Sequence, residues 1–488
     1  MAVEDADGID LAARRNERIV LASLAAVQFV SIVDFVIMMP LGPQLMRSLT
    51  IGPAEFGLVV SAYTVAAGIG GLAFASLLDR VGRRAGFLGL YAAFLVGTLL
   101  CGLAPGYRTL LAARAITGAF GGVLGGMALT IIGDVFPEER RGRATGVLMS
   151  AFALASVAGV PIGLWLGTHY GWRVPFLALV GLGCPVLVVA GLALPPLREH
   201  LSAGRPRGNV RDLVGTFTRR QHLDAFAVTI ALMLGGFAVV PFISTYLVGN
   251  AGVAETELPI VYVVGGAFTL VGAPLVGRLA DLYGKLRVFR VAAPASAMIM
   301  FGMTVLPNVG VAGASAAVAA LMIANTSRMV AATAMITSSV EASRRGGFMS
   351  ANSSIQHLSA GIGTFLAGHV VTQTAGGRME GYEWAGIFAA AMTLISVPLA
   401  ARLRIAPSSD RDVAGRSLDP AASLAAAAEA TCDAGEPLVT LGCMAAADDS
   451  TINDSGCDEP AEPASFSDDR PTPVGCGERS RSATSSTG

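Results

Sequence analysis

The stretch Leu77-Leu78-Asp79-Arg80-Val81-Gly82-Arg83-Arg84 has a counterpart, Gly277-Arg278-Leu279-Ala280-Asp281-Leu282-Tyr283-Gly284-Lys285, in the second half of the chain. The Asp-x-x-Gly pattern thus recurs after 202 residues (281 minus 79). Arg140-Arg141-Gly142 likewise recurs as Arg344-Arg345-Gly346, 204 residues later (344 minus 140). Repetition at one spacing is typical of a duplicated unit, and equal loop positions indicate that both copies run in the same direction.

Apolar runs long enough to cross a bilayer flank these loops. A hydrocarbon core about 30 Å thick needs about 20 apolar residues per helix. The runs lie at residues 19–42, 57–77, 86–104, 109–133, 144–168, 174–194, 224–247, 258–280, 288–306, 309–335, 348–371 and 384–401. We therefore predict an all-α membrane protein with twelve transmembrane helices in two six-helix repeats.

Composition leads to the same class. Of the 488 residues, 53% are hydrophobic and only 14% are charged, and the mean hydropathy is +0.62. These values exclude an ordinary soluble protein of this length. The apolar run that begins at residue 19 is too long for the core of a signal peptide, so it is predicted to remain as the first span.

The distribution of charge predicts the orientation and the domain boundaries. Most basic residues lie at the N-terminus and in the even-numbered loops, whereas the odd loops hold only Arg47, Arg108, Arg173 and Arg378. Basic residues near span ends stay in the cytoplasm, so both termini are expected there. The predicted parts are a cytoplasmic N-terminus (1–18), an N-terminal half (19–194), a cytoplasmic linker (195–223), a C-terminal half (224–404) and a disordered acidic tail (405–488).

Several function classes lack the residues they need. The apolar part contains only Cys101 and Cys184, and the four tail cysteines have no C-x-x-C spacing, so neither a zinc site nor a disulfide framework is predicted. No H-E-x-x-H, G-x-S-x-G or P-loop motif occurs. The basic residues are scattered through loops, which disfavours a nucleic-acid partner. We therefore expect no enzyme activity, no metal and no cofactor, and the oligomeric state stays open.

The two loops quoted above resemble the G-x-L-A-D-R-x-G-R-K signature of the major facilitator superfamily. Ala75 stands where the N-terminal copy should have its first Gly, and Leu282 and Leu286 replace basic residues in the C-terminal copy. The resemblance implies a motif that stabilises one face of the transport cycle, formed by Asp79, Arg80, Gly82, Arg83, Gly277, Asp281 and Gly284. Glycine would allow the short loop backbone angles that other residues resist. Alternatively, the arginines act only as topology anchors.

Two opposite charges lie inside predicted spans. Arg114 lies in the fourth span and Asp34 in the first; their depths are similar, so Asp34 is the expected partner of Arg114. The sequence around Asp34 resembles the first span of bacterial drug and sugar (arabinose-like) efflux proton antiporters, in which an acidic residue carries the coupling proton. Burial favours a protonated carboxyl group and a nearby Arg favours the ionised one, so access from one side or the other could change its protonation. A fixed structural pair is the alternative.

Other polar and small residues complete the predicted sites. Gln28, Asn325, Arg328 and Gln356 are candidates to line the substrate cavity, with Arg328 suited to an anionic or polar substrate. Small residues predicted to allow close helix packing are Gly118, Gly122 and Gly126 in span 4 and Gly159, Pro161 and Gly163 in span 5. The span 5 segment resembles the antiporter motif of efflux members, although Val160 separates its Gly from its Pro.

The sequence thus predicts a secondary transporter of the bacterial inner membrane that works by alternating access. Its expected partners are a small-molecule substrate, protons and the lipid bilayer, and proton-coupled efflux of drugs, sugars or metabolites is the leading hypothesis. An uncoupled facilitator or importer is the alternative, for which Asp34 would be dispensable. A membrane sensor that signals through the tail is a further alternative. Fold class alone does not name the substrate.

Overall fold

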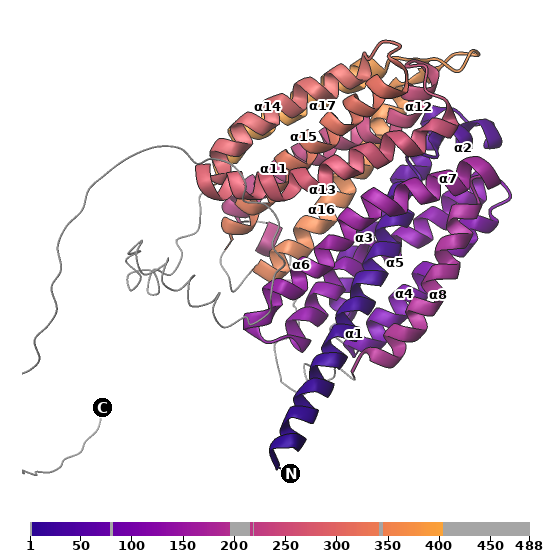
Figure 1. The fold of residues 1–488 in the computed structure, drawn as a ribbon. Coiled ribbons are helices and arrows are strands. Elements are labelled where there is room, and N and C mark those ends of the chain that lie inside the picture. Colours follow the sequence, from indigo (N-terminus) through magenta and orange to yellow (C-terminus); the bar gives the residue numbers. More distant parts are fainter. Residues whose placement is uncertain (1, 79–81, 196–214, 218, 341–344, 404–488) are drawn as a thin grey trace, which may run out of the picture. The chain divides into compact units, whose positions relative to one another are not determined.

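The structure is a computed structural model that describes residues 2–78, 82–195, 215–217, 219–340 and 345–403. Of the predicted linker, residues 196–214 and 218 lie outside this range, as does the whole predicted tail. Figure 1 follows the chain through a bundle of long helices, joined mostly by short loops.

The N-terminal half consists of long helices whose apolar runs match the predicted spans. Its helices are α1 (Ala2–Ile37), α2 (Gly42–Leu49), α3 (Pro53–Leu78), α4 (Arg83–Leu103), α5 (Tyr107–Val135), α6 (Glu138–Leu154), α7 (Val160–Tyr170) and α8 (Val174–Ala193). A π-helical turn, η1 (Ala155–Gly159), joins α6 to α7 without a break. The first helix, α1, begins at Ala2, well before the apolar run that starts at residue 19.

The C-terminal half repeats this arrangement. Its elements are α11 (Arg220–Val239), η2 (Val240–Phe242), α12 (Ile243–Gly249), η3 (Glu255–Glu257), α13 (Leu258–Tyr283), α14 (Lys285–Thr304), α15 (Gly310–Ser338), α16 (Arg345–Val370) and α17 (Tyr382–Ala401). Between α16 and α17, the strands β1 (Thr372–Gln373) and β2 (Met379–Glu380) pair antiparallel, with Thr372 opposite Glu380.

Eleven helices among the described residues are long and apolar enough to cross a membrane. The remaining predicted span, 348–371, forms α16, which has sufficient length but carries Asn352, Ser354, Gln356 and His357. Polar residues are tolerated in a membrane helix when neighbouring helices cover them. The predicted helical membrane fold is confirmed, with one short pair of strands added, whereas the count of twelve spans and the cytoplasmic termini stay predictions.

The two halves meet along two pairs of helices. The helix α3 packs against α16, and η1 and α7 pack against α13. Small residues allow the first contact: a methyl group on Gly68 would lie 2.9 Å from the Ser354 carbonyl oxygen, and one on Gly361 would lie 2.7 Å from Thr64 Oγ1. Backbones can approach this closely only where side chains are absent.

The two ends of the bundle are named here by their helices. Figure 1 shows α2, α7 and α12 at one end, which we call the distal end, opposite the N-terminus of α1 at the proximal end. At the distal end α2 contacts α12, and α7 contacts η3. The Phe56 ring also packs edge-on against Phe242, with 5.8 Å between centroids. The distal end is therefore held closed by contacts between the halves.

Candidate functional site

The centre of the N-terminal half contains a buried ion pair. Nη1 of Arg114, on α5, donates a hydrogen bond of 2.9 Å to Oδ2 of Asp34, on α1. The same nitrogen lies 3.4 Å from the Asp34 carbonyl oxygen. Both side chains are 0% exposed. The structure thus brings together the two charges that the sequence suggested as partners.

Two neutral side chains contact this ion pair. Thr98 Oγ1, on α4, donates to Asp34 Oδ1 over 3.2 Å, and the Tyr63 ring, on α3, lies 4.3 Å from Arg114 Cζ. A cation over an aromatic face is attracted by the ring quadrupole. Nε and Nη2 of Arg114 are buried without a hydrogen-bond acceptor among the described residues. The guanidinium therefore keeps donor capacity that the described protein groups do not use.

Sequence reasoning missed Thr98 and Tyr63. Both are polar groups within otherwise apolar helices, and that pattern was the only available signal. The Tyr63 ring also stacks on Phe35 with 5.1 Å between centroids, and Phe35 lies 6.1 Å from Phe237 of α11 in the C-terminal half. A continuous set of aromatic contacts therefore joins the ion pair to the opposite half.

Glycine residues allow neighbouring helices to approach α5 and α1, the two helices of the ion pair. A methyl group on Gly118 would overlap the backbone of Tyr63, and one on Gly122 would overlap Ala67, both on α3. On the other side of α1, Gly159 lies against Val33, next to Asp34. Gly163 lies against Ile37 in the same way, and Pro161 is the second residue of α7, which follows the π-helical turn. Such turns are frequent at functional sites.

Gly126 does not belong to this packing surface. It is exposed, and a methyl group placed there would meet nothing within 4 Å. The expectation that Gly118, Gly122 and Gly126 form one seam is therefore wrong for the last of them, because Gly126 lies on a face of α5 that no neighbouring helix covers. Gly125, one residue earlier, instead faces the Gln28 amide, 3.2 Å from the position of a methyl group.

The candidates in the C-terminal half form a separate group. Arg328 is 1% exposed and donates to Asn325 Oδ1 on α15 and to Thr393 Oγ1 on α17. Gln356, on α16, is half-buried. Among the described residues, no recorded hydrogen bond joins Gln28, Gln356 or Arg328 to the ion pair. The six predicted cavity residues thus do not form one hydrogen-bonded network.

The two signature loops are described in part. Asp79 and Arg80 lie outside the described residues. Gly82 precedes α4 with φ −55°, an ordinary backbone angle, whereas Gly284 separates α13 from α14 with φ +89°. The expected need for glycine therefore holds at Gly284 and is wrong at Gly82.

Charged residues of the signature loops bind other helices. Arg83 forms an ion pair with Asp134, at the end of α5. Lys285 Nζ donates to Ser338 Oγ over 2.8 Å, while Asp281 is exposed and Gly277 lies within α13. The gating role of these loops stays a prediction.

Comparison with known proteins decides the family. The sequence matches the family model of the Major Facilitator Superfamily over residues 24–327 and 226–444. The chain belongs to the major facilitator superfamily. Its membership accounts for the duplicated halves and for the two signature loops.

Individual relatives of this superfamily member are distant. The chain is 29% identical over 244 residues to the inner membrane transport protein YdhP of Escherichia coli K12. The matched region covers 50% of this chain and 61% of YdhP. It is also 29% identical over 264 residues to a chloramphenicol resistance protein of Streptomyces lividans. This match covers 53% of this chain and 64% of that protein. The matched parts thus span about six-tenths of these relatives.

A solved structure has the same fold. The crystal structure of a bacterial homologue of the human lysosomal transporter Spinster, in an inward-facing and unoccupied conformation, superimposes with a TM-score of 0.62 at 17% identity. The superposition covers 80% of this chain and 99% of that one. The superfamily fold therefore extends over both halves.

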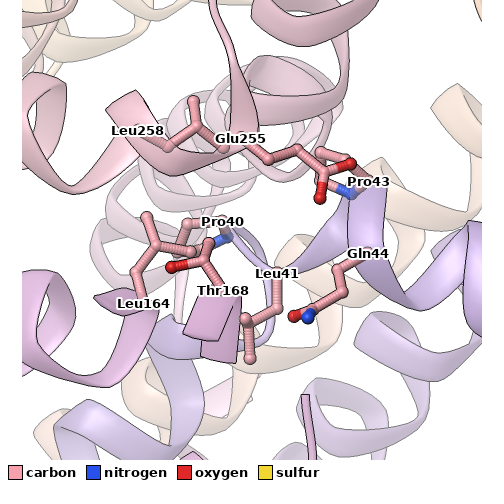
Figure 2. A pocket seen from close by; sticks show the side chains of 8 residues that line it. All are labelled: Pro40, Leu41, Pro43, Gln44, Leu164, Thr168, Glu255 and Leu258. Atoms are coloured by element: carbon pink, nitrogen blue, oxygen red, sulfur yellow. The ribbon is translucent and has the colours of Figure 1, made fainter. Parts of the chain in front are cut away.

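The halves of this superfamily member also form an ion pair at the distal end. Arg47, on α2, donates to Glu255, at the start of η3, over 2.5 and 2.8 Å. These hydrogen bonds raise the pKa of Arg47 above its ordinary value, so the guanidinium stays charged. Figure 2 shows Glu255 and Leu258 across a small pocket from Pro43 and Gln44. The ion pair closes the seam between the halves beside this pocket.

We expect Glu255→Gln to loosen the distal seam. The Arg47 side chain is 68% exposed, and exposed ion pairs contribute roughly 0.2–1 kcal/mol, which corresponds to about a 1.4- to fivefold population change. Spin labels at Ser48 and Thr256 should then report a larger fraction of long distances. The charge-swapped double variant Arg47→Glu/Glu255→Arg should restore the original distribution. An unchanged distribution in Glu255→Gln would mean that the pair does not hold the seam.

Proposed function

We propose that the protein is a secondary transporter of the bacterial inner membrane that exports small molecules in exchange for protons, with both termini in the cytoplasm. The buried Asp34–Arg114 pair carries this proposal. Ionisable groups inside a membrane bundle are costly and are functional by default. The name of the chloramphenicol resistance relative is consistent with export. Transport rather than enzyme chemistry is the activity that the superfamily supports.

The geometry suggests how proton binding would act. With Asp34 ionised, its two oxygens accept hydrogen bonds from Arg114 and Thr98. A proton on Asp34 removes the negative charge, so Arg114 loses its ionic partner while its Nε and Nη2 groups still lack acceptors in the described part of the chain. A buried unpaired charge is unfavourable, so protonation favours a state in which water or substrate reaches Arg114.

The aromatic contacts would transmit this change to the seam between the halves. Phe35 follows Asp34 directly on α1 and contacts both Tyr63 and Phe237. A shift of α1 that accompanies loss of the ion pair must therefore repack the contact with α11. Interfaces of this kind change between discrete arrangements, as alternating access requires.

Proteoliposomes with an imposed pH gradient test the proposal. A panel of sugars, including arabinose, and amphipathic drugs, including chloramphenicol, would be added while an internal dye records proton movement. We expect at least one compound to drive proton flux in the wild type and in Asp224→Asn, whose half-buried carboxyl group lies near the start of α11. Asp34→Asn should bind that compound and drive no proton flux.

The same assay separates the alternatives. Equal movement of labelled cargo in wild type and Asp34→Asn without proton flux would favour an uncoupled facilitator or importer, in which the ion pair is structural. Deletion of residues 407–488 tests the sensor hypothesis. A sensor would lose its cellular response while the truncated protein retained full flux.

A further inference from the structure

Within the part of the chain that the structure describes, Arg328 is a buried cation held by neutral groups. Its Nε and Nη2 donate to Asn325 Oδ1 over 3.2 and 2.8 Å, and its Nη1 donates to Thr393 Oγ1 over 2.7 Å. The residue is 1% exposed. Both acceptors orient the guanidinium without neutralising its charge.

No carboxylate partner for Arg328 occurs among the residues that the structure describes. The recorded ion pairs join Arg47, Arg83, Arg114 and Arg140 to acidic residues. Arg114 differs in this respect, because Asp34 balances its charge within the bundle. A buried cation without a counter-charge is unfavourable in a membrane bundle. An anion from outside the described part of the chain would therefore stabilise Arg328.

The guanidinium also keeps N–H donors that no described acceptor uses. Arginine has five N–H groups, and the recorded hydrogen bonds use three of them, so Nη1 and Nη2 each keep one. Nη2 faces Gly236 on α11, where a methyl group would lie 2.9 Å from it. Two adjacent N–H groups on a fixed guanidinium match the two oxygens of a carboxylate.

The location of Arg328 is suited to a transported ligand. Gly236 precedes Phe237, the residue of α11 that contacts Phe35 on α1. Arg328 and the Asp34–Arg114 pair therefore lie on opposite sides of one contact between the halves. Substrate sites in this type of transporter form between the two repeats, near the middle of the membrane.

We propose that Arg328 binds the carboxylate of a monoanionic cargo, with Asn325 and Thr393 as positioning residues and with Gly236 allowing α11 to lie close to the guanidinium. This inference rests on the proposed transport function and specifies its substrate class. The cargo is an organic acid whose remaining part is apolar, because the helices around Arg328 are mostly apolar.

Binding to the full-length protein in lipid nanodiscs tests this site. The probes are benzoate, 3-phenylpropionate and octanoate, each compared with its primary amide in chloride-free buffer by calorimetry and thermal unfolding. Hydrogen bonds to charged groups contribute about 1.5–3 kcal/mol, so a carboxylate should bind wild type roughly 10- to 100-fold more tightly than its amide. That preference should fall close to one in Arg328→Gln and should persist in Arg108→Gln, which alters an exposed arginine.

Further variants separate this site from a structural role and from proton coupling. Arg328→Gln without ligand should unfold at the same or a higher temperature than wild type, because no described carboxylate loses a partner. Gly236→Ala should weaken carboxylate binding severalfold. Asp34→Asn should keep the carboxylate preference even where proton exchange is lost, so failure of proton coupling and failure of this site are distinguishable.

Three outcomes would overturn the proposal. The first is that no carboxylate binds wild type more tightly than its amide. The second is that Arg328→Gln keeps the preference. The third is that chloride alone gives the whole stabilisation and carboxylates add nothing, which would assign Arg328 to a structural anion.

Discussion

Arg114→Gln is expected to lower the free energy of unfolding by about 3–5 kcal/mol, because it leaves the Asp34 carboxylate buried without its counter-charge. The pair has 0% exposure on both sides, so solvent cannot replace the lost partner. Thr98 supplies only one neutral hydrogen bond to Asp34. Unfolding in mixed detergent micelles, followed by the helical signal, would measure the loss.

The double variant Asp34→Asn/Arg114→Gln provides the matched control. Removal of both charges leaves two neutral amide groups, so most of the lost stability should return. If Arg114→Gln and Asp34→Asn instead lowered stability by amounts that simply add in the double variant, the two residues would not be energetically coupled, and the ion pair would not be the feature that stabilises this part of the bundle.

The second large effect is expected from Gly118→Ala. The added methyl group would overlap the Tyr63 backbone, which a side-chain rotation cannot relieve. Overpacking of this kind lowers stability by about 1–3 kcal/mol. It would also push α3 away from α5 and move the Tyr63 ring from Arg114. Thermal unfolding and the proton-flux assay would report the two consequences.

Gly126→Ala makes the same chemical change eight residues further along α5 (126 minus 118), where the position is open. Alanine is favoured over glycine in helices by roughly 0.5–1 kcal/mol, so this variant should be as stable as wild type or more stable. Equal losses in both variants would indicate that helix flexibility, rather than close packing at Gly118, makes glycine necessary.

The sequence was sufficient for features that depend on periodicity and charge. Apolar run lengths predicted the membrane helices because the bilayer imposes a fixed length. The partnership of Asp34 and Arg114 was also predictable, because a charge inside a membrane bundle needs a partner and few candidates exist.

Contacts between helices could not be read from one sequence. Which face of α5 packs against α3 depends on how the helices cross, and for that reason Gly126 was wrongly grouped with Gly118 and Gly122. Tyr63 and Thr98 come from helices that no local pattern connects to Asp34. The π-helical turn at Ala155–Gly159 likewise has no simple sequence signature.

Two further features could be established only from the three-dimensional structure. The pattern Asp-x-x-Gly is the same in both copies, yet only Gly284 has a positive φ. The helix α16 was predicted as a span from its apolar run although it also carries polar residues, and its contact with α3 explains why such a sequence is stable inside the bundle.

The central claim is that Asp34 carries the proton that is exchanged for cargo. Proton release on substrate binding tests this claim most directly. The purified protein would be mixed with the compound identified in proteoliposomes, in weakly buffered solution with a pH-sensitive dye. We predict proton release by wild type and by Asp224→Asn, and none by Asp34→Asn at a concentration that saturates its binding. Equal release by wild type and Asp34→Asn would contradict the account.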